Sequence, residues 1–307
     1  MQNKNKTPPK AHHARTVFAS LFGTLAVFLI LSSVISVWLN RTLTDTKTYV
    51  AVVGPLATKP DIQNFIAKKA SEALAKNVPP QDAAVALLPP SALQQTPEQI
   101  NAQLQPIVYS NVLKVISSPT FATIWTQANQ TAHSSLVNQL NSDNDQLQLN
   151  LNPVIVAVTK QLSTTDLAPV AGEIEISPDM GQVNLQGTGI SKAHSYYKLF
   201  KRSTIVIVVA ALLSLAASIA LSVHHLKTIR RILIATGVML LLLAASIQAP
   251  SIIAIKLTDV ETQKAMVVIM QSIFHNLQIA SLIGGLGCII VAIGTKVFEK
   301  LNRPSKT

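Results

Sequence analysis

Four long apolar runs divide the chain. They cover residues 16–38, 203–223, 232–255 and 277–297. An α-helix rises about 1.5 Å per residue, so about 20 apolar residues cross the roughly 30 Å hydrocarbon core of a bilayer. The pattern therefore predicts four transmembrane helices, the third of which reaches residue 255 only if it continues past Pro250. The first run is too long for a cleavable signal peptide and has no small-residue cleavage site after it, so we expect an uncleaved signal anchor.

Between the first two runs, residues 39–202 show the alternation of polar and apolar positions that is typical of a folded domain. We expect a helical continuation over residues 40–53, and further helices that begin at Pro60, Pro97 and Pro119. A capping box at residues 96–99 supports the second of these starts. The helix from Pro119 has the clearest apolar stripe: Phe121, Ile124, Trp125, Ala128, Ala132, Leu136 and Leu140.

The spacing of apolar positions then changes from about 3.6 residues, as in a helix, to 2 residues, as in a strand. Residues 146–151, 173–176 and 182–185 alternate polar and apolar side chains, which predicts a small sheet of two or three strands. A short helix from Asn152 lies between them, and a helix from Ile190 is expected to run into the second span. The predicted fold class is an integral membrane protein, mainly α, with four transmembrane helices and an extracytoplasmic, mostly helical α+β domain.

A further helical segment, residues 256–276, precedes the fourth span and opens with a capping box at Thr258–Glu261. Either this helix continues into the span, or it breaks near His275 and lies at the membrane interface. The sequence leaves both alternatives open.

Composition and charge place these segments relative to a membrane. Charged residues make up 13% of the chain, against roughly 25% in soluble domains, and the mean hydropathy is +0.37. Of the net charge of +11, residues 1–15 carry an excess of four positive charges, and residues 224–231 and 296–307 carry three each. Short loops rich in Lys and Arg remain in the cytoplasm.

The charge pattern therefore predicts a multi-pass protein of the cell membrane with both termini in the cytoplasm. Residues 1–15 and 298–307 are the expected cytoplasmic tails, and residues 224–231 the cytoplasmic loop. Residues 39–202 and 256–276 are then extracytoplasmic. Because the basic residues flank the spans, we expect them to meet the lipid bilayer and not nucleic acid.

Several motifs resemble those of a known family. They are Thr48-Tyr49-Val50-Ala51-Val52-Val53-Gly54-Pro55-Leu56-Ala57, Pro60-Asp61-Ile62-Gln63, Phe121-x3-Trp125-x2-Ala128-Asn129-x2-Ala132-His133 and Tyr197-x-Leu199. Together they resemble an uncharacterised family of four-span integral membrane proteins from actinobacteria and related bacteria, with one extracytoplasmic domain between spans 1 and 2. In that family Arg often follows the Asn, where this chain has Gln130, so a role that needs the Arg does not transfer. The resemblance implies a layout and no activity.

Phe121, Trp125, Asn129 and His133 recur every four residues and so form one stripe on a helix. One interpretation is a binding face, with an aromatic wall and two hydrogen-bonding groups. The other, which we favour, is that the aromatic residues belong to the core and the polar pair ties this helix to a neighbouring segment.

Motifs for catalysis, metals and cofactors are missing from the sequence. His133, His194 and His275 lie on three separate segments, none has a second His at helical spacing, and the single cysteine, Cys288, lies within a span. No nucleophile elbow, phosphate loop or zinc motif occurs. We therefore expect no metal, no cofactor and no enzymatic activity, with a surface hydrolase built around His133 as an alternative. The span interiors lack ionisable residues, which argues against an ion-coupled transporter.

Small residues recur every fourth position in two spans. They are Ala210, Ser214, Ser218 and Ser222 in the second span, and Ala280, Gly284, Cys288 and Ala292 in the fourth. Such ridges let helices approach closely in lipid. They serve either packing within one molecule or an interface with another, and the oligomeric state stays open.

The function predicted from these features is that of a non-catalytic cell-envelope protein whose extracytoplasmic domain binds a partner, an envelope component or a small ligand. The main alternative is an auxiliary subunit of a membrane transport or secretion complex, with an envelope or membrane-complex protein as its partner.

Overall fold

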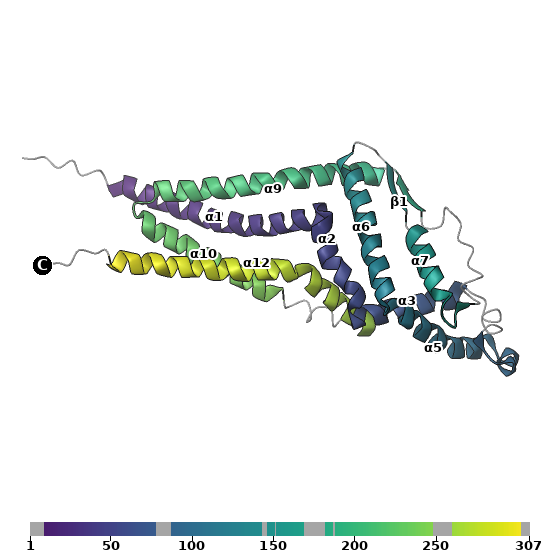
Figure 1. Cartoon of the computed structure of the whole chain (residues 1–307). Coiled ribbons are helices and arrows are strands. Elements are labelled where there is room, and N and C mark those ends of the chain that lie inside the picture. The colour runs from purple at the N-terminus through teal and green to yellow at the C-terminus, as the bar shows by residue number, and fades with distance from the viewer. Residues whose placement is uncertain are drawn as a thin grey trace, which may run out of the picture. The chain divides into compact units, whose positions relative to one another are not determined.

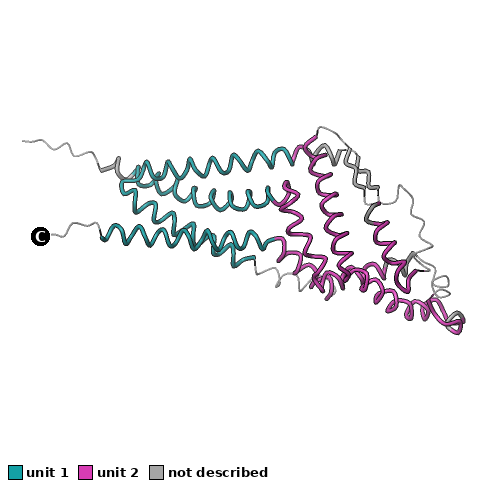
Figure 2. The backbone as a smooth tube through the Cα atoms, in the orientation of Figure 1, with its two compact units in different colours: residues 1–41, 197–249, 274–307 teal, residues 42–196, 250–273 magenta. Residues whose placement is uncertain are grey.

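The computed structural model of the chain is mainly helical (Figure 1). It describes residues 9–77, 87–142, 146–150, 152–168, 182–186, 188–247 and 260–301. The chain divides into two compact units (Figure 2). Unit 1 contains residues 1–41, 197–249 and 274–307, and unit 2 contains residues 42–196 and 250–273.

Among the residues that the structure describes, four helices contain segments that are long and apolar enough to cross a membrane: α1 (Pro9–Thr44), α9 (Thr188–Leu221), α10 (His225–Ser246) and α12 (Val260–Leu301). Much of their apolar surface points away from the protein, as at Ile205, Val206 and Leu213, whose exposed fractions are 65–67%. Exposed apolar surface of this kind marks contact with lipid or with another protein. Four such helices indicate a multi-pass membrane protein in contact with the bilayer, as the hydropathy pattern predicts.

The third of these helices differs from its apolar run at both ends. α10 begins at His225, seven residues before the apolar run that starts at residue 232. Lys227, Arg230 and Arg231 are polar but form helices well, so the helix extends beyond the apolar run at this end. Most of the expected basic loop is therefore the first two turns of α10. Its helix ends at Ser246, and the expected continuation over residues 248–255 lies outside the described residues.

Unit 2 begins with a helix that the sequence pattern missed. We expected one helical continuation over residues 40–53, but α1 ends at Thr44 and a separate helix, α2 (Thr46–Val53), follows. Asp45 causes the break. It adopts an extended backbone, and its side chain accepts a hydrogen bond of 2.7 Å from the backbone N–H of Thr48, so it is the N-cap of α2.

Four further α-helices of unit 2 begin where local signals predict. They are α3 (Pro60–Asn77), α5 (Pro97–Ile116), α6 (Pro119–Asn141) and α7 (Asn152–Leu162). The described part of unit 2 also contains two 3₁₀ segments that the sequence pattern does not predict, η1 (Gly54–Thr58) and η2 (Pro90–Gln94). The capping box is confirmed, since Thr96 and Gln99 exchange both hydrogen bonds. Ser118 caps α6 by accepting a bond from the N–H of Phe121.

Two short strands, β1 (Gln146–Asn150) and β2 (Gln182–Gln186), pair antiparallel. Leu147 lies opposite Leu185, and Leu149 opposite Val183. The third alternating segment, residues 173–176, lies outside the described residues.

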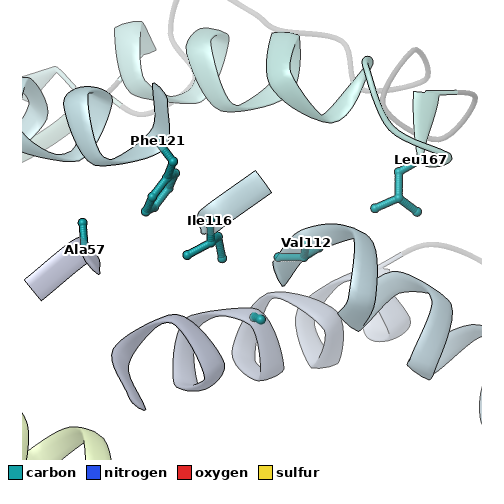
Figure 3. Close-up of a cluster of buried hydrophobic side chains, with 6 residues drawn as sticks. Ala57, Val112, Ile116, Phe121 and Leu167 are labelled. Carbon is teal, nitrogen blue, oxygen red and sulfur yellow. The ribbon is translucent and has the colours of Figure 1, made fainter. Parts of the chain in front are cut away.

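The main core of unit 2 lies among η1, α3, α5 and α6. Its buried members are Ala57, Ala67, Val112, Ile116, Phe121 and Leu167 (Figure 3). A second cluster joins Leu56 and Ile62 to Ala265 of α12, and Lys68 of α3 forms an ion pair with Glu261 of α12. α12 thus belongs to the fold of unit 2 over its first four turns.

The helix α12 has 42 residues, or about 63 Å at 1.5 Å per residue. It continues without interruption past His275 and Asn276. The helical segment before the fourth span is therefore continuous with the span, which is the first of the two alternatives that the sequence left open.

Candidate functional site

The stripe of aromatic and polar residues predicted on α6 lies against α2. α2 has only eight residues, too few to be stable alone, so its conformation depends on this packing. Thr46, Tyr49 and Val53 follow one another at helical spacing and lie on one face of α2. Three hydrogen bonds and one ring-stacking contact join this face to α6, and we call them the α2–α6 ladder.

The contacts of the ladder pair increasing residue numbers on α6 with decreasing residue numbers on α2. The indole Nε1 of Trp125 donates a hydrogen bond of 3.0 Å to the backbone oxygen of Val53. One turn further along α6, Asn129 Oδ1 accepts a long hydrogen bond of 3.4 Å from the Tyr49 hydroxyl, while Asn129 Nδ2 donates to the Trp125 carbonyl at 2.8 Å. Rising numbers on α6 thus meet falling numbers on α2, so the helices are antiparallel.

His133 forms the last rung. Its Nδ1 lies 3.1 Å from the Thr46 hydroxyl, and its ring stacks on Tyr49 with ring centroids 4.1 Å apart and planes inclined by 16°. The side chain is only 7% exposed. A buried histidine with two such contacts holds the start of α2 against α6.

The electrostatic environment favours a neutral His133. Burial lowers the pKa of its imidazole from the ordinary value of 6.5, because the charged form loses its hydration, while the Leu43 carbonyl and the Asp45 carboxylate act in the opposite direction. Burial likewise raises the pKa of the Tyr49 phenol. Asp45 itself is exposed, and its bond to the N–H of Thr48 lowers the pKa of its carboxyl group.

The structure divides the four predicted binding residues into two groups. Phe121 is 7% exposed and belongs to the main core (Figure 3). Trp125, Asn129 and His133 direct their polar atoms to α2 or to the backbone of α6. These contacts are the ones expected of the packing interpretation.

Sequence reasoning did not assign a role to Thr46 and Tyr49. Both lie more than 75 positions from their partners on α6, so no local pattern connects them. The spacing of Thr46, Tyr49 and Val53 indicates that they share a face of a helix, but it does not indicate which segment that face meets.

The residues needed for metal chemistry do not come together in the part of the chain that the structure describes, where no group of three or more His, Cys, Asp or Glu side chains could hold an ion. As for acid–base chemistry, His133 touches a hydroxyl, but the nearby carboxylate of Asp45 is bonded to the backbone of α2.

The small-residue ridge on α9 packs against unit 1 itself. Ser214, Ser218 and Ser222 are buried, and Ala210 is half-buried. The Ser218 hydroxyl donates to the Ala19 carbonyl of α1 at 2.8 Å. Because these positions contact this chain, the ridge on α9 serves packing within the molecule.

On α12 the close approach to α10 involves part of the predicted ridge. Ala280 is exposed, Gly284 and Cys288 are half-buried, and Ala292 is 1% exposed. A side-chain carbon added at Gly237 of α10 would lie 3.3 Å from the Cβ of Cys288. A further close contact is at Gly285, outside the ridge, where a side-chain carbon would lie 3.0 Å from the backbone oxygen of Gly237.

Two buried residues outside the predicted ridge, Ser281 and Gly285, complete the face of α12 that meets α10. Ser281, Gly285, Cys288 and Ala292 alternate steps of four and three and remain on one side, and Ser281 is fully buried.

Comparisons with known proteins found no match: no protein-family model, no curated protein and no solved structure matches the chain.

Proposed function

We propose that this chain is a non-catalytic protein of the cell envelope that presents unit 2 outside the cytoplasm, where it binds a partner, an envelope component or a small ligand. The orientation rests on charge: the basic excess lies in residues 1–15, 224–231 and 296–307, whereas residues 39–202 are nearly neutral, with twelve basic and eleven acidic side chains. Under the positive-inside rule this distribution puts both termini and the start of α10 in the cytoplasm. The layout agrees with that of the resembled four-span family.

The observation that carries the non-catalytic part of the proposal is the α2–α6 ladder. The indole, amide and imidazole groups of Trp125, Asn129 and His133 already have partners within unit 2. A general base must reach the proton that it removes from a substrate, and a histidine that is 7% exposed is badly placed for that task. These residues support the architecture that displays the binding surface.

A surface hydrolase is the second candidate, and the contact between His133 and the Thr46 hydroxyl is the observation in its favour. Substituting His133 with Ala separates the two. In the proposed role the variant is less stable and loses no hydrolytic activity, whereas loss of a measurable activity at unchanged folding would support the hydrolase.

The test of the proposal is to isolate the full chain in mild detergent or native lipid particles and to identify by mass spectrometry what accompanies it. An envelope protein, glycan or small ligand that is retained through unit 2 supports the proposal. A stoichiometric integral membrane protein that binds through the spans would instead favour an auxiliary subunit of a transport or secretion complex. Purified chain that binds nothing from envelope extracts would contradict both.

A further inference from the structure

A cavity of about 360 Å³ lies within unit 1, between α1, the end of α9 and the first half of α10. Its volume is in the range of small-ligand sites. All the lining residues belong to unit 1, so the cavity is independent of the α2–α6 ladder and of whatever unit 2 binds.

One end of the cavity is positively charged. Lys227 and Arg231 line it from successive turns of α10, and no Asp or Glu is among the lining residues. Neither cation forms an ion pair or hydrogen bond with any residue that the structure describes. The neighbouring Arg230, by contrast, is paired with Glu299 at 3.2 Å. The two cations of the cavity therefore have no counter-charge from the described protein and favour an anion.

The lining changes from polar to apolar along the two helices. On α1 the hydroxyl residues Thr16, Ser20 and Thr24 come first, and Val27 and Phe28 follow. On α10 the lining ends at Met239. From Thr16 to Phe28 the helix rises about 18 Å, slightly more than half of the roughly 30 Å hydrocarbon core.

This gradient matches the order of groups in one phospholipid: phosphate, glycerol and ester oxygens, then acyl chain. The apolar end is also open to the bilayer, since Phe28 is 57% exposed on a span. A free phosphate compound would leave the apolar part of the cavity unfilled. The chemistry therefore favours a lipid over a soluble anion.

We propose that this cavity binds one anionic phospholipid, with its phosphate at Lys227 and Arg231 and its acyl chain along Val27, Phe28 and Met239. With the orientation argued above, the lipid comes from the cytoplasmic leaflet. The site does not require the proposed role of unit 2, and failure of one leaves the other intact.

Native mass spectrometry of the full chain, with added phosphatidylglycerol or phosphatidylcholine, tests the site. We expect one retained phosphatidylglycerol per chain and at least tenfold weaker retention of phosphatidylcholine. The variant K227Q/R231Q should lose about tenfold or more in affinity for phosphatidylglycerol. The matched control K296Q/K300Q removes two exposed cations of α12 that do not line the cavity, and it should bind like the unaltered chain.

A second variant keeps the charge and blocks the apolar part. Ala235 lines the cavity and is exposed, so Ala235→Phe should weaken phosphatidylglycerol binding while both cations remain. Glycerol phosphate is the soluble probe: if it binds as tightly as the lipid, and equally well to Ala235→Phe, the ligand is a free anion and the lipid proposal is wrong. Equal binding of both lipids, or full binding by K227Q/R231Q, would also overturn it. Thermal unfolding of each variant verifies that it is folded.

Discussion

Removal of the His133 imidazole should lower the free energy of unfolding of unit 2 and leave its exposed side chains unchanged, because His133 is buried. The substitution His133→Ala deletes the contact with Thr46 and the stacking on Tyr49. A net hydrogen bond contributes about 1 kcal/mol, and an aromatic pair adds about 0.5–1.5 kcal/mol beyond burial. With the lost burial of the ring, the expected cost is about 2–4 kcal/mol.

The assay is thermal unfolding of the full chain in detergent, followed by near-ultraviolet circular dichroism. At about 2–4 °C per kcal/mol for a domain of this size, the midpoint should fall by about 5–15 °C. The control is Thr131→Ala, an exposed position on the same helix, for which we expect a change within about 0.5 kcal/mol. Equal midpoints for His133→Ala and the control would refute the structural role of the ladder.

The pH dependence provides an independent check of the same contact. Since the pKa of His133 is lowered in the folded protein, the unfolded chain binds more protons as the pH falls below the ordinary value of about 6.5. The stability contributed by the neutral imidazole is therefore present above that pH and is lost as the pH falls through the lowered pKa. The advantage of the unaltered protein over His133→Ala should shrink over this range. An advantage that grows with acidity would mean that the charged form is the one stabilised.

Three further substitutions test separate contacts in thermal unfolding. Gly237→Ala would put a carbon 2.9 Å from a backbone oxygen of α12, and it should lower the free energy of unfolding by about 1–3 kcal/mol. The control is Gly294→Ala, where no atom lies within 4 Å of the added carbon, and it should be neutral or stabilising by up to about 1 kcal/mol. Equal effects of the two substitutions would contradict the α10–α12 packing. Trp125→Phe leaves a smaller aromatic ring at this position and removes the bond to the Val53 carbonyl, at a cost of about 1–2 kcal/mol. No change would mean that this bond is not formed. Glu261→Gln removes a half-exposed ion pair with α3 and should cost under about 1 kcal/mol, and a larger loss would show that the pair holds α12 to unit 2.

The sequence predicts features that depend on a few neighbouring residues. The starts of α5 and α6 follow from Thr96 and Ser118, because a cap and a proline at the first helical position act within one turn. The apolar runs predict the spans for a similar reason, since hydrophobic length alone decides whether a segment fits the bilayer.

Two features of the fold do not follow from the sequence pattern. The N-cap Asp45 is a local signal, but the apolar pattern continues on both sides of it, so the sequence does not predict that α2 is a separate helix. The partners of Asn129 and His133 then remained unknown. On α12, the burial of Gly285 in place of Gly284 depends on which face meets α10, and small residues occur on several faces of that helix.

In the proposed orientation, unit 2 lies outside the cytoplasm and the basic start of α10 lies inside. Cysteine labelling tests it directly, because Cys288 is the single native cysteine and can be replaced by Ala. In that background, Thr131→Cys marks an exposed position of unit 2, and Leu226→Cys marks the start of α10. With a membrane-impermeant maleimide, we predict labelling of Thr131→Cys in intact cells, and of Leu226→Cys only after permeabilisation. Labelling of Leu226→Cys in intact cells, together with protection of Thr131→Cys, would contradict the proposed orientation in the membrane.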